Sequence, residues 1–135
     1  MIVSVVLAIV PILCVRTEAR RSRVALVVAA LLPTLTLALF YSLAIHMHRS
    51  FGGWPESIGT HGFPGRLALH ANLAMFSFSW MLLGTLVLVP GLVLCACVPK
   101  LRPGVHYIAV YALSTAIAFG VMQLAPEPFL YWWRD

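Results

Sequence analysis

The chain has few charged residues. Only 10% of its 135 residues are Asp, Glu, Lys or Arg, whereas 61% are hydrophobic. A soluble domain carries about 25% charged residues, so this chain lacks the polar side chains that would cover a water-facing surface. The sequence therefore predicts that the lipid bilayer is its solvent. Four membrane spans of about 20 residues each would use most of a chain of this length.

Among the charged residues, acids are fewer than bases, and none lies inside an apolar run. The four acids are Glu18, Glu56, Glu127 and Asp135. Ionisable groups at mid-membrane mark proton and substrate paths, so their absence argues against a coupled transporter. The chain also lacks paired carboxylates, a nucleophile beside a base and a Gly-rich phosphate loop, and we expect no enzyme activity. A small channel or transporter formed by oligomers remains an alternative.

Cysteine is also scarce, with only Cys14, Cys95 and Cys97. In the topology argued below, all three lie near the cytoplasmic ends of helices. We therefore expect reduced thiols and no disulfide framework. Three thiolates could bind a soft metal, but no C-x-x-C motif occurs, and cysteine is an ordinary small apolar residue in such helices.

Four apolar segments fill the sequence. The predicted spans are 2–15, 24–45, 67–98 and 105–125. The first is shorter than a usual span of about 20 residues. Arginines follow it instead of preceding it, which is the reverse of a secretory signal. The predicted fold class is an all-α integral membrane protein, a bundle of four transmembrane helices that forms one domain over residues 1–135.

The basic residues set the expected orientation. Six of them lie in two loops, 16–23 and 99–104, which an even number of spans separates, so both loops lie on one side of the membrane. The other side has three basic residues balanced by three acids. The positive-inside rule places the two basic loops in the cytoplasm and both termini outside it. We expect an inner membrane of bacterial type, and this placement of charge argues against nucleic-acid binding.

Aromatic residues and histidines gather on the outer side. The loop 46–66 is rich in Gly and Pro, so we expect it not to be helical. Amphipathic rings favour the headgroup region of a bilayer. The residues expected to anchor the protein at this interface are Trp54, Tyr131, Trp132 and Trp133.

Small residues recur at helical spacing in three of the spans. Such stripes permit close approach of helix backbones in lipid. The residues expected to form helix contacts are Ala30, Thr34, Ala38, Ser42, Ser77, Gly84, Gly91, Ala112, Ala116 and Gly120. His46 continues the first stripe and His70 precedes the second. We therefore predict that these two rings face the bundle interior near the outer surface, within about 10 Å of each other, because packed helices lie 8–10 Å apart.

The histidines are the candidate binding residues. A zinc or copper site would use His46, His48, His61 and His70. A b-type haem would be held by His46 and His70, and a chlorophyll-type pigment could take a single histidine. The alternative is that these rings only form hydrogen bonds to Ser42, Asn72 and loop carbonyls, so that the protein holds no cofactor. We favour this alternative.

The extramembrane parts are too small for a soluble activity. The expected partners are the lipid bilayer and other membrane-protein subunits. We expect a non-catalytic accessory or assembly subunit of a larger membrane complex, for example an energy-transducing one. A haem- or metal-binding electron-transfer protein that uses His46 and His70 is the second hypothesis.

Overall fold

The computed structural model describes residues 23–54 and 63–134, and every regular element in this part is helical. Its elements are α2 (Arg23–Phe51), α3 (Gly65–Cys97), the 3₁₀ helix η1 (Pro99–Gly104), α4 (Val105–Met122) and α5 (Glu127–Arg134). Within these residues, three helical stretches are long and apolar enough to cross a membrane. The protein is thus an integral membrane protein. The predicted first span, 2–15, lies outside the described residues.

One predicted boundary differs clearly from the structure. Helix α2 continues to Phe51, past the predicted end at Ile45, because neither glycine nor proline occurs between Ile45 and Gly52. Gly52 has a φ of 67°, the left-handed conformation that commonly follows a helix C-terminus. The prediction that loop 46–66 is not helical is therefore wrong for residues 46–51, which precede the first glycine of the loop. Helices α3 and α4 begin and end within a few residues of the predicted bounds.

The C-terminal tail forms helix α5, which the sequence reading did not anticipate. The Pro126 carbonyl accepts hydrogen bonds from the backbone N–H groups of Phe129 and Leu130, both at 3.0 Å. Proline is well tolerated at the start of a helix because its missing N–H is not needed there. Glu127 also suits the positive end of the helix dipole. The two prolines that end the last span therefore also begin α5.

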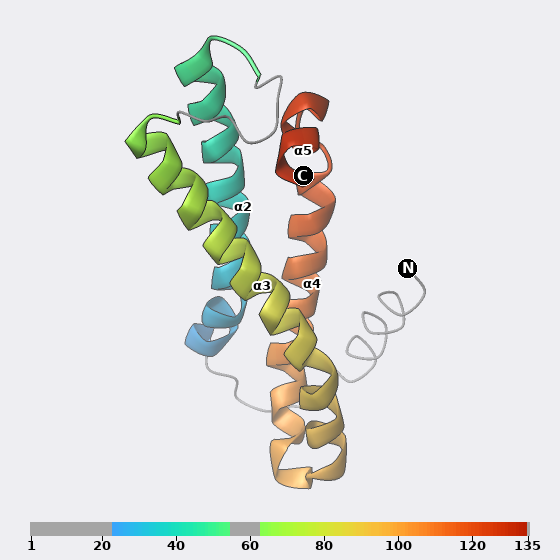
Figure 1. Cartoon of the computed structure of the whole chain (residues 1–135). Coiled ribbons are helices and arrows are strands. Elements are labelled where there is room, and N and C mark those ends of the chain that lie inside the picture. Colours follow the sequence, from blue (N-terminus) through green and yellow to red (C-terminus); the bar gives the residue numbers. More distant parts are fainter. Residues whose placement is uncertain (1–22, 55–62, 135) are drawn as a thin grey trace.

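Helices α2 and α4 pack on each other, and α3 crosses this pair obliquely (Figure 1). Its N-terminal half lies beside α2, and its C-terminal half lies beside α4, to which η1 joins it. The 33 residues of α3 correspond to about 50 Å of helix. A bilayer core measures about 30 Å. The oblique course of α3 is a usual way for a long helix to match that thickness.

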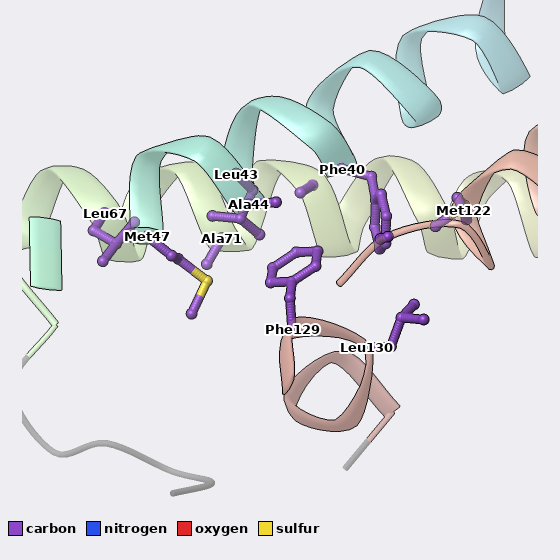
Figure 2. Close-up of a cluster of buried hydrophobic side chains, with 11 residues drawn as sticks. Phe40, Leu43, Ala44, Met47, Leu67, Ala71, Met122, Phe129 and Leu130 are labelled. Carbon is purple, nitrogen blue, oxygen red and sulfur yellow. The ribbon is translucent and has the colours of Figure 1, made fainter. Parts of the chain in front are cut away.

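An apolar core of buried side chains lies at the α5 end of the bundle. Figure 2 shows Phe129 extending from α5 toward α2, between Met47 and Phe40. The rings of Phe40 and Phe129 lie with centroids 5.0 Å apart in an edge-on arrangement, which aromatic pairs favour. The side chains of Phe40, Met47, Leu67 and Phe129 are fully buried. Helix α5 therefore closes this end of the bundle.

Polar side chains join the helices within the spans. The Thr36 hydroxyl lies 2.9 Å from the Leu32 carbonyl and 3.2 Å from the Ser77 carbonyl of α3. The Tyr41 hydroxyl donates to the Val121 carbonyl of α4 at 2.6 Å. The lipid core offers no hydrogen-bond partners, so these bonds satisfy hydroxyl groups that would otherwise be unpaired in the membrane. They also link α2 to both α3 and α4.

Candidate functional site: a histidine pair between α2 and α3

The structure brings His46 of α2 and His70 of α3 into direct contact. Their Nδ1 atoms lie 3.0 Å apart, and their ring centroids are 5.3 Å apart. Both rings are partly buried. The prediction that these two rings lie within about 10 Å of each other is confirmed. Their position follows from the packing of the last turns of α2 on the first turns of α3.

Ser42 completes a chain of hydrogen bonds. Its Oγ lies 2.9 Å from His70 Nε2 and donates to the Leu39 carbonyl at 3.0 Å. A hydroxyl has one proton and a neutral imidazole has one N–H. The bonds are all satisfied when His46 Nδ1–H donates to His70 Nδ1 and His70 Nε2–H donates to Ser42. Both rings are neutral in this arrangement, which needs no outside ligand. The expected hydrogen bond to Ser42 is therefore present.

The orientation of the two rings bears on cofactor binding. The difference between the centroid and Nδ1 separations is close to twice the distance from a ring centre to a ring nitrogen. The two Nδ1 atoms therefore point at each other along the line that joins the rings. Metal ligands must instead direct their lone pairs at a third point, and a haem between the rings would require space for a macrocycle. Both rings would have to turn or move apart before they could ligate a metal ion or a haem iron.

His48, which belongs to the predicted metal site, does not join this pair in the structure. His48 lies against Trp54, with ring centroids 4.7 Å apart. Helix α2 continues through both positions, and residues two apart on a helix face different sides. His61 lies outside the described residues. Among residues 23–54 and 63–134, no group of three or more His, Cys, Asp or Glu side chains could hold a metal ion.

The small-residue stripes have different positions in the three helices. In α3, Ser77 is buried, and Gly84 and Gly91 are half-buried against Tyr111 and Ile108 of α4. A Cβ at Gly84 would overlap the Tyr111 hydroxyl and ring, and one at Gly91 would lie 3.3 Å from Ile108. The α3 stripe therefore lies against α4 at Gly84 and Gly91, whereas Ser77 contacts Thr36 of α2.

The stripes of α2 and α4 face largely away from the chain's own contacts. Exposed stripe residues are Thr34, Ala38, Ser42, Ala116 and Gly120, while Ala30 and Ala112 are half-buried. The buried face of α2 instead consists of larger residues such as Phe40, Leu43 and Met47. Bulky side chains have more apolar surface to bury than alanines do. Packing within the bundle therefore buries the face of α2 with the bulky side chains and leaves the alanine face exposed. Close helix packing at these exposed positions is not seen among residues 23–54 and 63–134 and stays a prediction.

The expected interface anchors divide into two groups. Tyr131 is exposed on α5, in a position to meet the headgroup region. Trp54, Trp132 and Trp133 are half-buried and pack around the core. Trp133 lies 5.0 Å from Phe40 between ring centroids. These three indoles therefore help to hold α5 on the bundle.

Two tyrosine contacts were not anticipated from the sequence. Tyr41 and Tyr111 each donate to a carbonyl of a neighbouring helix, Val121 and Met81 respectively. A tyrosine inside an apolar span needs such a partner, and this requirement was the available signal.

No family model, curated protein or solved structure matches this chain. The functional argument therefore rests on the geometry of the chain itself.

Proposed function

We propose that this protein is a non-catalytic accessory or assembly subunit of a larger membrane complex. In this proposal it forms a bundle of four transmembrane helices with both termini outside the cytoplasm. Its role is to contribute packing surfaces within the bilayer. The basic loop at η1 then lies on the cytoplasmic side, as the positive-inside rule requires.

The observation that carries the proposal is the pair of exposed small-residue faces. Ala38 of α2 and Gly120 of α4 are exposed, and no atom of another residue would lie within 4 Å of a Cβ at Gly120. Exposed large side chains such as Leu31 and Ile117 lie on the same helices. Faces that combine small residues with larger apolar neighbours suit contact with another helix in lipid, because the backbones can approach closely.

The polar groups inside the bundle support a structural role. The hydroxyls of Thr36, Tyr41 and Tyr111 all bond to carbonyls of the chain itself, and the His46–His70 pair is closed by Ser42. Within the described residues the only acid is Glu127, which lies outside the spans. A proton or substrate path would need ionisable groups within the membrane.

Site-specific photo-crosslinking tests this proposal. A photoreactive residue at Ala38 or Gly120, in the tagged chain in its native membrane, should form one crosslinked product of defined mass with a different membrane protein. The same residue at Ser79, an exposed small position on α3, is the matched control and should give only lipid adducts. Lipid adducts alone at Ala38 and Gly120 would contradict the proposal.

A further inference from the structure

An apolar groove lies along one side of the α3–α4 pair. Trp80, Val87 and Gly91 of α3 line it, together with Tyr107 and Ile108 of α4, and Leu32 of α2 borders it. Its volume is about 540 Å³, within the usual range of about 300–1,000 Å³ for small-molecule sites. We refer to it as the α3–α4 groove. Trp80 and Val87 are exposed, so the groove opens to the surroundings of the bundle.

The length of the groove corresponds to one leaflet of a bilayer. Its lining on α3 runs from Trp80 to Gly91, which is about 17 Å of helix. Half of a hydrocarbon core measures about 15 Å. The Gly91 and Tyr107 end lies toward η1, and the Trp80 end lies nearer the middle of α3. The groove therefore has the length and the apolar lining that one lipid chain requires.

Positive charge lies beyond the η1 end of the groove. Lys100 and Arg102 are exposed in η1, and no acid occurs anywhere between Gly65 and Met122. Tyr107 lies in the first turn of α4, a few residues after these cations in the sequence, and lines the groove. Its hydroxyl has no hydrogen-bond partner among the described residues, unlike those of Tyr41 and Tyr111. Cations and a free hydroxyl at this end are suited to a phosphodiester.

We propose that the α3–α4 groove binds an anionic phospholipid of the leaflet that contains η1. One acyl chain lies along Trp80, Val87 and Gly91, while Lys100 and Arg102 attract the phosphate. Tyr107 donates a hydrogen bond to a headgroup oxygen. Basic positions next to grooves between membrane helices select anionic headgroups in this way. The proposal is independent of the accessory-subunit proposal, since neither Ala38 nor Gly120 lines this groove.

Fluorescence quenching by brominated lipid tests the site, because Trp80 lies in the groove and the other three tryptophans lie at the α5 end of the bundle. The full chain is placed in phosphatidylcholine vesicles that contain acyl-brominated phosphatidylglycerol or acyl-brominated phosphatidylcholine. The Trp80→Phe variant identifies the share of quenching that comes from Trp80. We expect that share to saturate at a lower fraction of phosphatidylglycerol than of phosphatidylcholine. The difference should be about fivefold for each basic residue that contributes.

Two charge variants make the test specific. Lys100→Gln with Arg102→Gln should abolish the preference for phosphatidylglycerol. Arg49→Gln with Arg66→Gln, which removes two exposed charges from the opposite end, should preserve it. Equal quenching by both lipids would show ordinary surrounding lipid only, and equal loss in both variants would show a general charge effect. Absence of Trp80 quenching by either lipid would mean that residues 1–22 or a second copy cover the groove. Each of these three results would overturn the proposal.

Discussion

The closest contact between α3 and α4 gives the most specific stability prediction. A methyl group at Gly84 would overlap the hydroxyl and ring of Tyr111. That hydroxyl donates to the Met81 carbonyl at 2.7 Å, and Met81 is fully buried. Tyr111 therefore cannot accommodate the methyl group without moving its ring and giving up the hydrogen bond. Gly84→Ala should destabilise the protein although alanine favours a helix.

The expected loss of stability is the sum of two destabilising effects and one stabilising effect. Overpacking a well-packed site costs about 1–3 kcal/mol, and a lost hydrogen bond costs about 1 kcal/mol. Replacing glycine by alanine within a helix contributes about 1 kcal/mol in the other direction. The Met81 carbonyl keeps its second donor, Thr85, at 2.9 Å, which limits the hydrogen-bond loss. We expect Gly84→Ala to lower the free energy of unfolding by about 1–2 kcal/mol.

A thiol-reactive dye can follow this change in detergent. Cys95 is buried, so in a background of Cys14→Ser and Cys97→Ser it reacts only when the bundle opens. Gly120→Ala is the matched control, because a Cβ there would contact nothing within 4 Å. This control should be neutral or slightly stabilising.

A double-mutant cycle separates the overlap from other effects. In a Tyr111→Ala background the overlapping atoms are gone, so Gly84→Ala should become neutral or stabilising by up to about 1 kcal/mol. The reasoning is refuted if Gly84→Ala is as stable as Gly120→Ala. It is equally refuted if the cost of Gly84→Ala persists unchanged without the Tyr111 ring.

Three further outcomes follow from the same structure. A cysteine at Gly53 should react with an impermeant reagent from outside the cell, whereas one at Pro103 should not; labelling of Pro103 from outside would reverse the orientation. His70→Asn should lower stability by no more than about 1.5 kcal/mol, since it removes two partly buried hydrogen bonds and asparagine can restore one. Its absorption spectrum and metal content should match those of the wild type, and a bleached Soret band or a released metal ion would identify His70 as a ligand. Ala38→Leu should leave the unfolding of the isolated chain within about 0.5 kcal/mol, because its side chain is exposed; a cost as large as that of Gly84→Ala would show that Ala38 is buried.

The sequence could predict the histidine contact because helical spacing determines which residues share a face. The α2 stripe meets α3 at its C-terminal end, where Ser42 and His46 contact His70. Thr34 and Ala38 of the same stripe are exposed. The same reasoning could not identify the neighbour of each stripe. A small residue permits close packing, but the choice of face depends on which side chains fill the space between helices. In α2 the buried face is the one that carries Phe40 and its buried neighbours. A pattern of alanines does not reveal this.

Helix α5 could not be predicted from the tail composition alone. A proline both ends a helix and begins one, so Pro126 and Pro128 allow either reading. The deciding factor is tertiary. Phe129 is fully buried in the core, and burying an aromatic ring contributes about 1.5–3 kcal/mol. An eight-residue segment gains little from helix formation by itself and depends on that contact.

The most direct test of the central claim is native mass spectrometry of the chain extracted from its own membrane in mild detergent. The accessory-subunit account predicts that the 14.8 kDa chain is found in fixed stoichiometry within a larger assembly that contains other membrane proteins. Leucine at both Ala38 and Gly120 should reduce that assembly while leaving the fold of the isolated chain unchanged. Recovery of the wild-type chain only as a monomer or as a homo-oligomer would contradict the account.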